Sequence, residues 1–465
     1  MTAFKPGAEG YRNKLTGPLL EIEEYRQALS AVENFSRPIN IGGPSESQKA
    51  HICYALCSQS GKKGAYVAFN EMQARKFYED FAFFLGEEVL YYPSKEVMLY
   101  DVEAKSNDAA YQRLQVLDRL LSGEFGFVVT SIEAISHKLI APDIFRRNTI
   151  EICYDGKIDL DVLIRDLVEM AYERVETVER RGQFAVRGGI VDIFPVGSDN
   201  AFRIELFGDE IDSLRTFDVN TQRSVGRTEK ARILPAREII YPSGKRDDIL
   251  KNIKSELKEA QKKNRSLGPR IEADIEKFKE NRYFPGIDRY IPFIADIPYS
   301  FTDYLPEDAF LFMDEPARQK QRIENLLLEH AETCKGLIEK AQLLPRSVNM
   351  FFDYEELDAK VLKKKLIYMN TINTGAPGSA AAAAKTYNIP GRLISPFGGN
   401  MDMLCESLSD WKKNKNRVLI LSGTRGRGER LREELFSKNI EAVYSDEVSS
   451  PLQPGQVVIT RGSLH

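Results

Sequence analysis

The sequence contains few of the residues that form disulfide frameworks and metal sites. It has five cysteines and four histidines among 465 residues. The scattered cysteines predict a protein of the reducing cytoplasm rather than a disulfide-stabilised secreted one. Cys53 and Cys57 lie one helical turn apart, but no two further ligands follow nearby, so buried apolar roles are expected instead of a metal site. The histidines show no paired spacing, which argues against a His-based metal or hydrolase site.

Long apolar runs and an excess of basic charge are missing too. No stretch approaches the length that crosses a membrane, and the N-terminus lacks a signal-peptide pattern, so no membrane partner is expected. The 65 Lys and Arg residues are balanced by 69 Asp and Glu residues, which leaves a net charge of −4. Stand-alone DNA-binding proteins usually carry a basic excess, so this class is not indicated. What is present, an apolar fraction of 42%, suffices for the cores of roughly two to four domains.

Strands and helices alternate along residues 1–148 at a spacing typical of an α/β domain. Such alternation predicts a parallel sheet with helices on its faces. We therefore expect this segment to form the first half of a RecA-like domain. The expected strands are residues 38–43, 65–69, 88–92 and 125–130, and the expected helices are residues 19–34, 45–58, 71–84 and 108–121.

The turn after the first expected strand is where a phosphate-binding loop would lie, with the sequence GGPSESQKA from Gly42 to Ala50. A working loop has the pattern G-x-x-x-x-G-K-[ST], because its glycines let backbone N–H groups wrap the phosphates and its hydroxyl binds magnesium. Aligned from Gly43, the second glycine is replaced by Gln48, the hydroxyl residue is replaced by Ala50, and only Lys49 is retained. Two interpretations remain, a lost nucleotide site and an unrelated strand–helix turn. Both predict no ATP hydrolysis and no bound cofactor.

A second acidic motif of nucleotide-hydrolysing proteins is altered in a similar way. Asp314 and Glu315 follow the apolar run 310–313, but Pro316 and Ala317 stand where a helicase-type motif would offer a polar pair. Without a hydroxyl at position 50 to hold a metal ion, both carboxylates are expected to be structural. The predicted degenerate nucleotide site comprises Gly43, Gln48, Lys49, Ala50, Asp314 and Glu315.

The segment 172–224 predicts a small β-rich module within residues 149–232. The strand-like runs QFAV, GIVDIF and FRIELF are separated by turn signals rich in glycine. Phe202, Ile204 and Leu206 alternate with charged residues, which predicts a strand with one buried face. The next run, IDSLRTF, alternates poorly, so its register is not predicted. Arginines and an aromatic residue on short strands form a surface suited to docking on another protein.

The same segment resembles a known module. RGGIVDIFP, RIELFGDEIDSLRTFD and TQRS are similar to the module shared by the excision-repair protein UvrB and the bacterial transcription-repair coupling factors (Mfd). In both families the resemblance implies docking of UvrA. UvrB-like chains carry an intact P-loop and a long tyrosine-rich hairpin, whereas the run YYPSKEVMLYDVEAKSNDAAYQRLQVL has no such insertion. The resemblance therefore implies the N-terminal part of a coupling factor.

Candidate docking residues come from the resemblance and from local chemistry. Arg174 and Arg187 match arginines of the UvrB pattern, while a third UvrB arginine falls on Ala185. Arg181 and Phe184 are added because a further guanidinium and an apolar anchor suit the same surface. The alternative is that these arginines only solvate a sheet edge or pair with nearby acidic side chains. Those acidic residues are Glu173, Glu176 and Glu179.

The module is expected to interrupt the first domain. Residues 233–345 would complete the core of that domain, and residues 346–465 would form a small separate α/β domain. The low-complexity stretch 375–385 is expected to be a loop. The turn GTRGRG at 423–428 lies between a strand and a helix, but no Lys-Ser/Thr follows, so an ordinary turn is favoured over a phosphate site. Because the chain stops directly after the expected strand 456–460, further C-terminal regions are expected.

Two hypotheses of function follow. The first is a protein-binding adaptor without catalysis, which recruits UvrA to RNA polymerase stalled at DNA damage. In such a family member, RNA polymerase and double-stranded DNA would be bound by further C-terminal regions, which would also use ATP and magnesium. The alternative is a divergent UvrB-type ATPase, a DNA-binding subunit of excision repair, that uses Lys49, Asp314 and Glu315.

Overall fold

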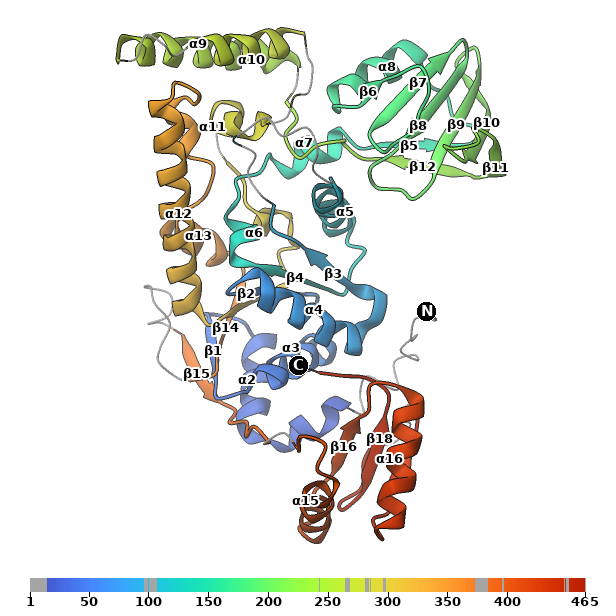
Figure 1. The fold of residues 1–465 in the computed structure, drawn as a ribbon, viewed down its shortest axis with the longest axis vertical. Coiled ribbons are helices and arrows are strands. Elements are labelled where there is room, and N and C mark those ends of the chain that lie inside the picture. Colours follow the sequence, from blue (N-terminus) through green and yellow to red (C-terminus); the bar gives the residue numbers. More distant parts are fainter. Residues whose placement is uncertain are drawn as a thin grey trace.

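The computed structural model contains a large parallel sheet with helices on both sides, a β-rich module and a small α/β part built from α15 (Met401–Lys413) to β18 (Val457–Thr460) (Figure 1). Among the described residues, no helix is long and apolar enough to cross a membrane. The described residues are 15–95, 99, 107–241, 243–263, 268–280, 284, 286–295, 298–372, 384–394, 397–446, 448 and 451–464.

The large sheet has seven strands in the order β15-β1-β14-β13-β2-β4-β3, and all neighbouring strands are parallel. The parallel sheet predicted from the N-terminal alternation is therefore confirmed. The strands are β1 (Ile39–Gly42), β2 (Gly64–Ala68), β3 (Val89–Tyr92), β4 (Phe127–Ser131), β13 (Phe310–Asp314), β14 (Lys365–Asn370) and β15 (Lys385–Asn388).

Helices cover both faces of this sheet. Because successive residues of a strand point to opposite sides, each strand contributes side chains to two cores. Tyr66 and Phe127 belong to one core, whereas their neighbours Val67 and Val128 belong to the other. Burial on both faces explains why these strands read as nearly continuous apolar runs. The first core includes α2 (Glu23–Glu33), α3 (Glu46–Ser60) and α4 (Glu71–Leu85), and the second includes α5 (Asp108–Ser122), α6 (Ile132–Ser136), α12 (Pro316–Glu339) and α13 (Tyr354–Val361).

The structure differs from the predicted boundary between residues 345 and 346. β14 and β15 follow that boundary in the sequence, yet they pair with β1 on its two sides. Ile367 and Met369 of β14 share a buried core with Ile39 and Ile41 of β1, which explains why they join the large sheet. The small part with its own sheet comprises α15 (Met401–Lys413), β16 (Val418–Leu421), α16 (Arg425–Ser437), β17 (Val443–Tyr444) and β18 (Val457–Thr460).

The β-rich module lies between α7 (Pro142–Arg147) and α9 (Arg246–Lys263). The chain enters through β5 (Ile150–Cys153) and leaves through β12 (Lys230–Ile233), and these two strands pair antiparallel. α8 (Leu160–Glu169) packs against a sheet with the order β11-β10-β9-β8-β7-β6. Its strands are β6 (Glu173–Arg174), β7 (Gln183–Arg187), β8 (Ile190–Phe194), β9 (Ala201–Phe207), β10 (Glu210–Phe217) and β11 (Ser224–Arg227).

The strands predicted for the module are confirmed, and the run without a predicted register has a physical explanation. That run is β10, whose pairing with β9 shifts between Ile211 and Ser213. Such an irregularity breaks the alternation of inward and outward side chains. The two hairpin turns are tight because Gly188 and Gly208 adopt left-handed φ values of 61° and 66°.

Two other sequence features can be placed. The turn GTRGRG leads from β16 into α16, where the Thr424 hydroxyl accepts a hydrogen bond from the Arg427 N–H at 3.4 Å. Of the low-complexity stretch expected to be a loop, residues 375–383 lie outside the described residues, and Lys385 begins β15. Two further α-helices among the described residues after the module are α10 (Pro269–Lys279) and α11 (Ile291–Ile294).

Candidate functional site

Lys49, the retained residue of the phosphate-loop pattern, is held by acidic side chains. Its ammonium Nζ lies 2.7 Å from Asp314 Oδ1 and 2.6 Å from Glu315 Oε1. Burial opposes the positive charge, but the two carboxylates outweigh this effect and raise the pKa of Lys49. The structure therefore brings together the three charged residues of the predicted nucleotide site, in an internal ion-pair cluster.

The side chain of Gln48 caps the first turn of α3. The Gln48 side-chain oxygen accepts a hydrogen bond from the Ser45 backbone N–H at 2.9 Å, which forms one half of a capping box. In a phosphate loop, N–H groups at this position point at the ligand. Ala50, two residues after Gln48, is fully buried, and its methyl side chain has no oxygen that could bind a metal ion. Hence Gln48 and Ala50 do not offer the contacts that a phosphate loop makes with phosphate and magnesium.

The turn after β1 is covered by the chain that follows β15. The Ile389 N–H donates to the Gly42 carbonyl at 2.8 Å, and the Gly391 N–H donates to the Gly43 carbonyl at 2.9 Å. Gly391 also lies so close to Gln48 that a Cβ atom added to it would stand 1.4 Å from Gln48 Oε1. Backbone of the same chain therefore occupies the surface of the turn where a phosphate loop would face its ligand.

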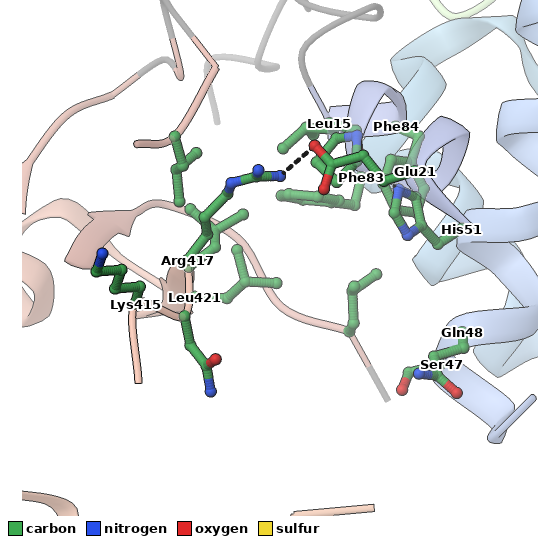
Figure 2. A pocket seen from close by; sticks show the side chains of 15 residues that line it. Leu15, Glu21, Ser47, Gln48, His51, Phe83, Phe84, Lys415, Arg417 and Leu421 are labelled. Atoms are coloured by element: carbon green, nitrogen blue, oxygen red, sulfur yellow. Dashed lines mark hydrogen bonds and ion pairs between the residues drawn. The ribbon is translucent and has the colours of Figure 1, made fainter. Parts of the chain in front are cut away.

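A cavity of about 650 Å³, lined in part by Ser47 and by Gln48 of the predicted nucleotide site, lies between the large sheet domain and the small C-terminal part (Figure 2). One wall carries His51 and Phe84, the opposite wall carries Leu421, and Arg417 pairs with Glu21 at 2.9 Å. Burial lowers the pKa of His51, so its ring is neutral at physiological pH. The charged residues at positions 49, 314 and 315 do not line this cavity. Within the described residues, no cluster of His, Cys, Asp or Glu has the arrangement of a metal site.

Phe184, predicted as an apolar anchor on the docking surface, is not on the surface. Its side chain is fully buried in the module core, together with Val191, Ile193 and Ile204 of the neighbouring strands. The reason is the alternation along β7, which turns Phe184 inward when Arg187, three residues later, points outward. This part of the prediction is corrected, because a side chain without exposed surface cannot contact a partner.

Two of the three candidate arginines do not share one surface with Arg187. Arg174 pairs in register with the inward-pointing Phe184, so it lies on the opposite face of the sheet, at its edge. Arg181 is tied to the loop before β9: its guanidinium donates to the Ser198 carbonyl at 3.0 Å and forms an ion pair with Asp199. Arg174, Arg181 and Arg187 therefore do not form a single cluster.

Arg187 lies on the outer face of the module sheet, the face turned away from α8. Its side chain is 53% exposed, and its Nη2 atom is 3.5 Å from Asp192 Oδ2. Asp192 itself is nearly buried and receives two hydrogen bonds from Arg203, at 2.7 and 2.9 Å. Arg203 thus satisfies most of the Asp192 carboxylate, and Arg187 keeps donors that face solvent.

Sequence reasoning missed two residues of this outer face, Ile190 and Phe207. Ile190 is 38% exposed and Phe207 is 82% exposed. A signal was present for Phe207, since it continues the alternation of Arg203 and Glu205 on the polar face of β9. An aromatic residue at such a position is placed on the surface by the same pattern that buries Phe202 and Ile204.

Comparisons with known proteins match the β-rich module to a known family and most of the chain to known relatives. Residues 150–239 match the family model of the UvrB interaction domain, which corresponds to the segment from β5 to the chain just after β12. The transcription-repair-coupling factor of Bacillus subtilis (strain 168) is 29% identical over 454 residues, which cover 96% of this chain and 38% of that protein. The transcription-repair-coupling factor of Staphylococcus aureus (strain bovine RF122 / ET3-1) is 27% identical over 460 residues, with the same shares.

The resemblance to the coupling factors is therefore confirmed along nearly the whole chain. It covers the N-terminal part of those proteins. The chain spans about 38% of the length of the relatives that it matches.

Proposed function

We propose that this chain acts as the N-terminal, UvrA-recruiting part of a transcription-repair coupling factor, and that it is a protein-binding adaptor without ATPase activity. The observation that carries this proposal is an exposed arginine, Arg187, on the open outer face of a module that matches the UvrB interaction domain. An arginine with free donors can form bidentate hydrogen bonds to a carboxylate of a partner, which few other side chains can do.

The arrangement around Lys49 supports an adaptor rather than an enzyme. We assign the large sheet to a RecA-like domain whose phosphate loop has been lost. Gln48 caps the turn, Ala50 lacks the magnesium-binding hydroxyl, and Lys49 is neutralised by Asp314 and Glu315. No observation on the described residues favours the alternative, a divergent UvrB-type ATPase.

The remaining activities of a coupling factor are assigned to the share of the longer relatives that this chain does not match. We propose that contacts with RNA polymerase and double-stranded DNA, and the use of ATP and magnesium, belong to that share. The adaptor would then act in the cytoplasm, where it would bring UvrA to polymerase stalled at DNA damage.

Titration of purified UvrA with this chain tests the proposal. Saturable binding is expected, and Arg187→Ala should weaken it about tenfold or more. Arg165→Ala is the matched control, since Arg165 is 63% exposed on α8, which packs on the opposite side of the sheet. A folded wild-type chain that does not bind UvrA would contradict the proposal. Saturable binding of ATP, abolished by Lys49→Ala, would support the ATPase instead.

A further inference from the structure

We infer that the cavity beside β16 is a docking site for an extended peptide segment of a partner protein, which would add a fourth strand to the small sheet. We call the strip formed by Arg417, Leu419 and Leu421 the β16 edge. This inference goes beyond the proposed function, because it concerns a site on the small C-terminal part rather than on the β-rich module.

The small sheet is open on the side of β16. Its strand order is β16-β18-β17, so within the described part of the chain β16 has a neighbouring strand on one side only. The Val418 and Ser422 N–H groups donate toward β18, with bonds of 2.9 and 3.0 Å. Because the N–H groups of successive strand residues point to alternate sides, those of Leu419 and Leu421 point away from β18. The β16 edge therefore offers backbone donors and acceptors to an added strand.

The side chains of the same residues face the cavity. Val418 and Ile420 pack in the core that the small sheet shares with α15 and α16, so both helices cover one face of the sheet. Leu419 and Leu421 alternate with them and point to the other face, toward the large sheet domain. Of the described residues that line the cavity, those in strands of the small sheet all belong to β16. The cavity therefore runs along the open edge, and its volume of about 650 Å³ is typical of a binding pocket.

The lining of the cavity indicates the chemistry of the partner. Phe83 and Phe84 of α4 lie across the cavity from β16 (Figure 2). Apolar side chains at alternate positions of an added strand would enter the space between these walls. Arg417 is paired with Glu21, whereas Lys415 forms no ion pair with a described residue. A carboxylate beside the apolar positions would match Lys415. The expected ligand is thus an extended segment with two apolar residues separated by one, flanked by Asp or Glu.

The test uses the whole chain and a phage library of short linear peptides as the probe. Enriched peptides should share the apolar alternation and the acidic flank, and fluorescence polarisation then gives their affinities. Leu419→Pro should weaken binding by about tenfold or more, because proline removes the outward N–H and leaves the hydrogen bonds to β18 in place. Thermal unfolding, together with the fluorescence of Trp411 in α15, checks that the small part stays folded.

Two further variants keep the test valid if the proline disturbs the fold. Leu421→Ala should weaken binding several-fold, and its control is Val443→Ala, since Val443 is 54% exposed on β17 at the opposite edge of the sheet. Lys415→Glu should also weaken binding several-fold, by repelling the acidic flank. Its control is Lys413→Glu, because Lys413 is 77% exposed on α15 and does not line the cavity.

N-methylation of the peptide distinguishes strand addition from simple filling of the cavity. Methyl groups placed on one peptide nitrogen at a time should weaken binding at every second position, because alternate N–H groups of an added strand face β16. Loss of affinity without this period of two would overturn the inference, as would a library that yields no enriched peptide. Self-association in sedimentation velocity that Leu419→Pro abolishes would assign the edge to a second copy of the chain and would also overturn it.

Discussion

Lys49 of α3 and Asp314 at the end of β13 form an ion pair whose side chains are only 1% and 2% exposed. Glu315 is a second acceptor for Lys49, and it has a left-handed φ of 46°, which is uncommon for a residue with a side chain. The Glu315 carboxylate also accepts a hydrogen bond from the Thr371 N–H at 2.7 Å, just after β14. Lys49 therefore connects α3, β13 and the chain after β14, and the bonds to Glu315 hold its unfavourable backbone conformation.

This connection predicts that Lys49 matters for stability. Lys49→Ala should lower the free energy of unfolding by about 3–5 kcal/mol, because two carboxylates would remain without their buried cation. Urea unfolding followed by circular dichroism measures the change. Lys62→Ala is the control: its pair with Asp308 is 34% and 63% exposed, and such pairs contribute about 0–1 kcal/mol. Similar small losses in both variants would show that the cluster is not structural.

Gly391 provides a second test of the covered turn. Gly391→Ala should lower the free energy of unfolding by about 1 kcal/mol, because the new Cβ displaces the Gln48 side chain from its cap on Ser45. In a Gln48→Ala background the cap is already lost, so the same substitution should cost much less. Chemical denaturation of the two single variants and the double variant gives the coupling energy. Additive effects would mean that the chain after β15 does not rest on Gln48.

The comparison of sequence and structure shows which features are local. Strands of the large sheet could be predicted because both of their faces are apolar, which local composition reveals. The membership of β14 and β15 in the sheet could not be predicted, because Ile39 pairs with Ile367 and Lys385, and both partners are far from Ile39 in the chain. A boundary placed from the local sequence does not detect such distant pairing.

The same reasoning applies to the docking residues. Alternation along QFAVR puts Phe184 and Arg187 on opposite faces, so the sequence already contained the evidence that only one of them is exposed. Which face is buried depends on α8 and on the strands at the base of the module, and this packing is not visible in β7 alone. The exposure of Phe207 also depends on this packing, which buries the other face of β9.

Phe184 and Phe207 should therefore differ sharply in their effects on stability. Phe184→Ala is expected to cost about 3–5 kcal/mol, as for other buried aromatic residues, since it leaves a cavity in the module core. Phe207→Ala should change the free energy of unfolding by no more than about 0.5 kcal/mol, because its ring is mostly in water. Denaturant unfolding of both variants measures the contrast. A large loss with Phe207→Ala would mean that this ring packs within the module.

A buried charge network beneath the module predicts how stability depends on pH. Glu238, in the chain that leaves the module, pairs with Arg113 of α5 and with Lys95 at 2.7 Å. Burial works to raise the pKa of Glu238, but Arg113 and Lys95 outweigh it and lower the pKa to about 2. Because this value lies below the 4.5 of an unperturbed glutamate, the carboxylate stabilises the folded chain fully above about pH 4.5. That contribution disappears as the pH falls through about 2.

We expect the Glu238 carboxylate to account for about 3 kcal/mol of the stability that is lost on acidification. This figure follows from the difference between its pKa in the folded chain and that of an unperturbed glutamate. Urea unfolding between pH 2 and 7 measures it. Glu238→Gln should be destabilised at neutral pH, because Arg113 and Lys95 lose their buried counter-charge, and its stability should fall less steeply below pH 4.5. Glu151→Gln is the control, since the Glu151 side chain is 46% exposed and its ion pairs are screened by water. If the free energy of unfolding falls equally steeply below pH 4.5 in wild type and in Glu238→Gln, another carboxylate controls acid unfolding.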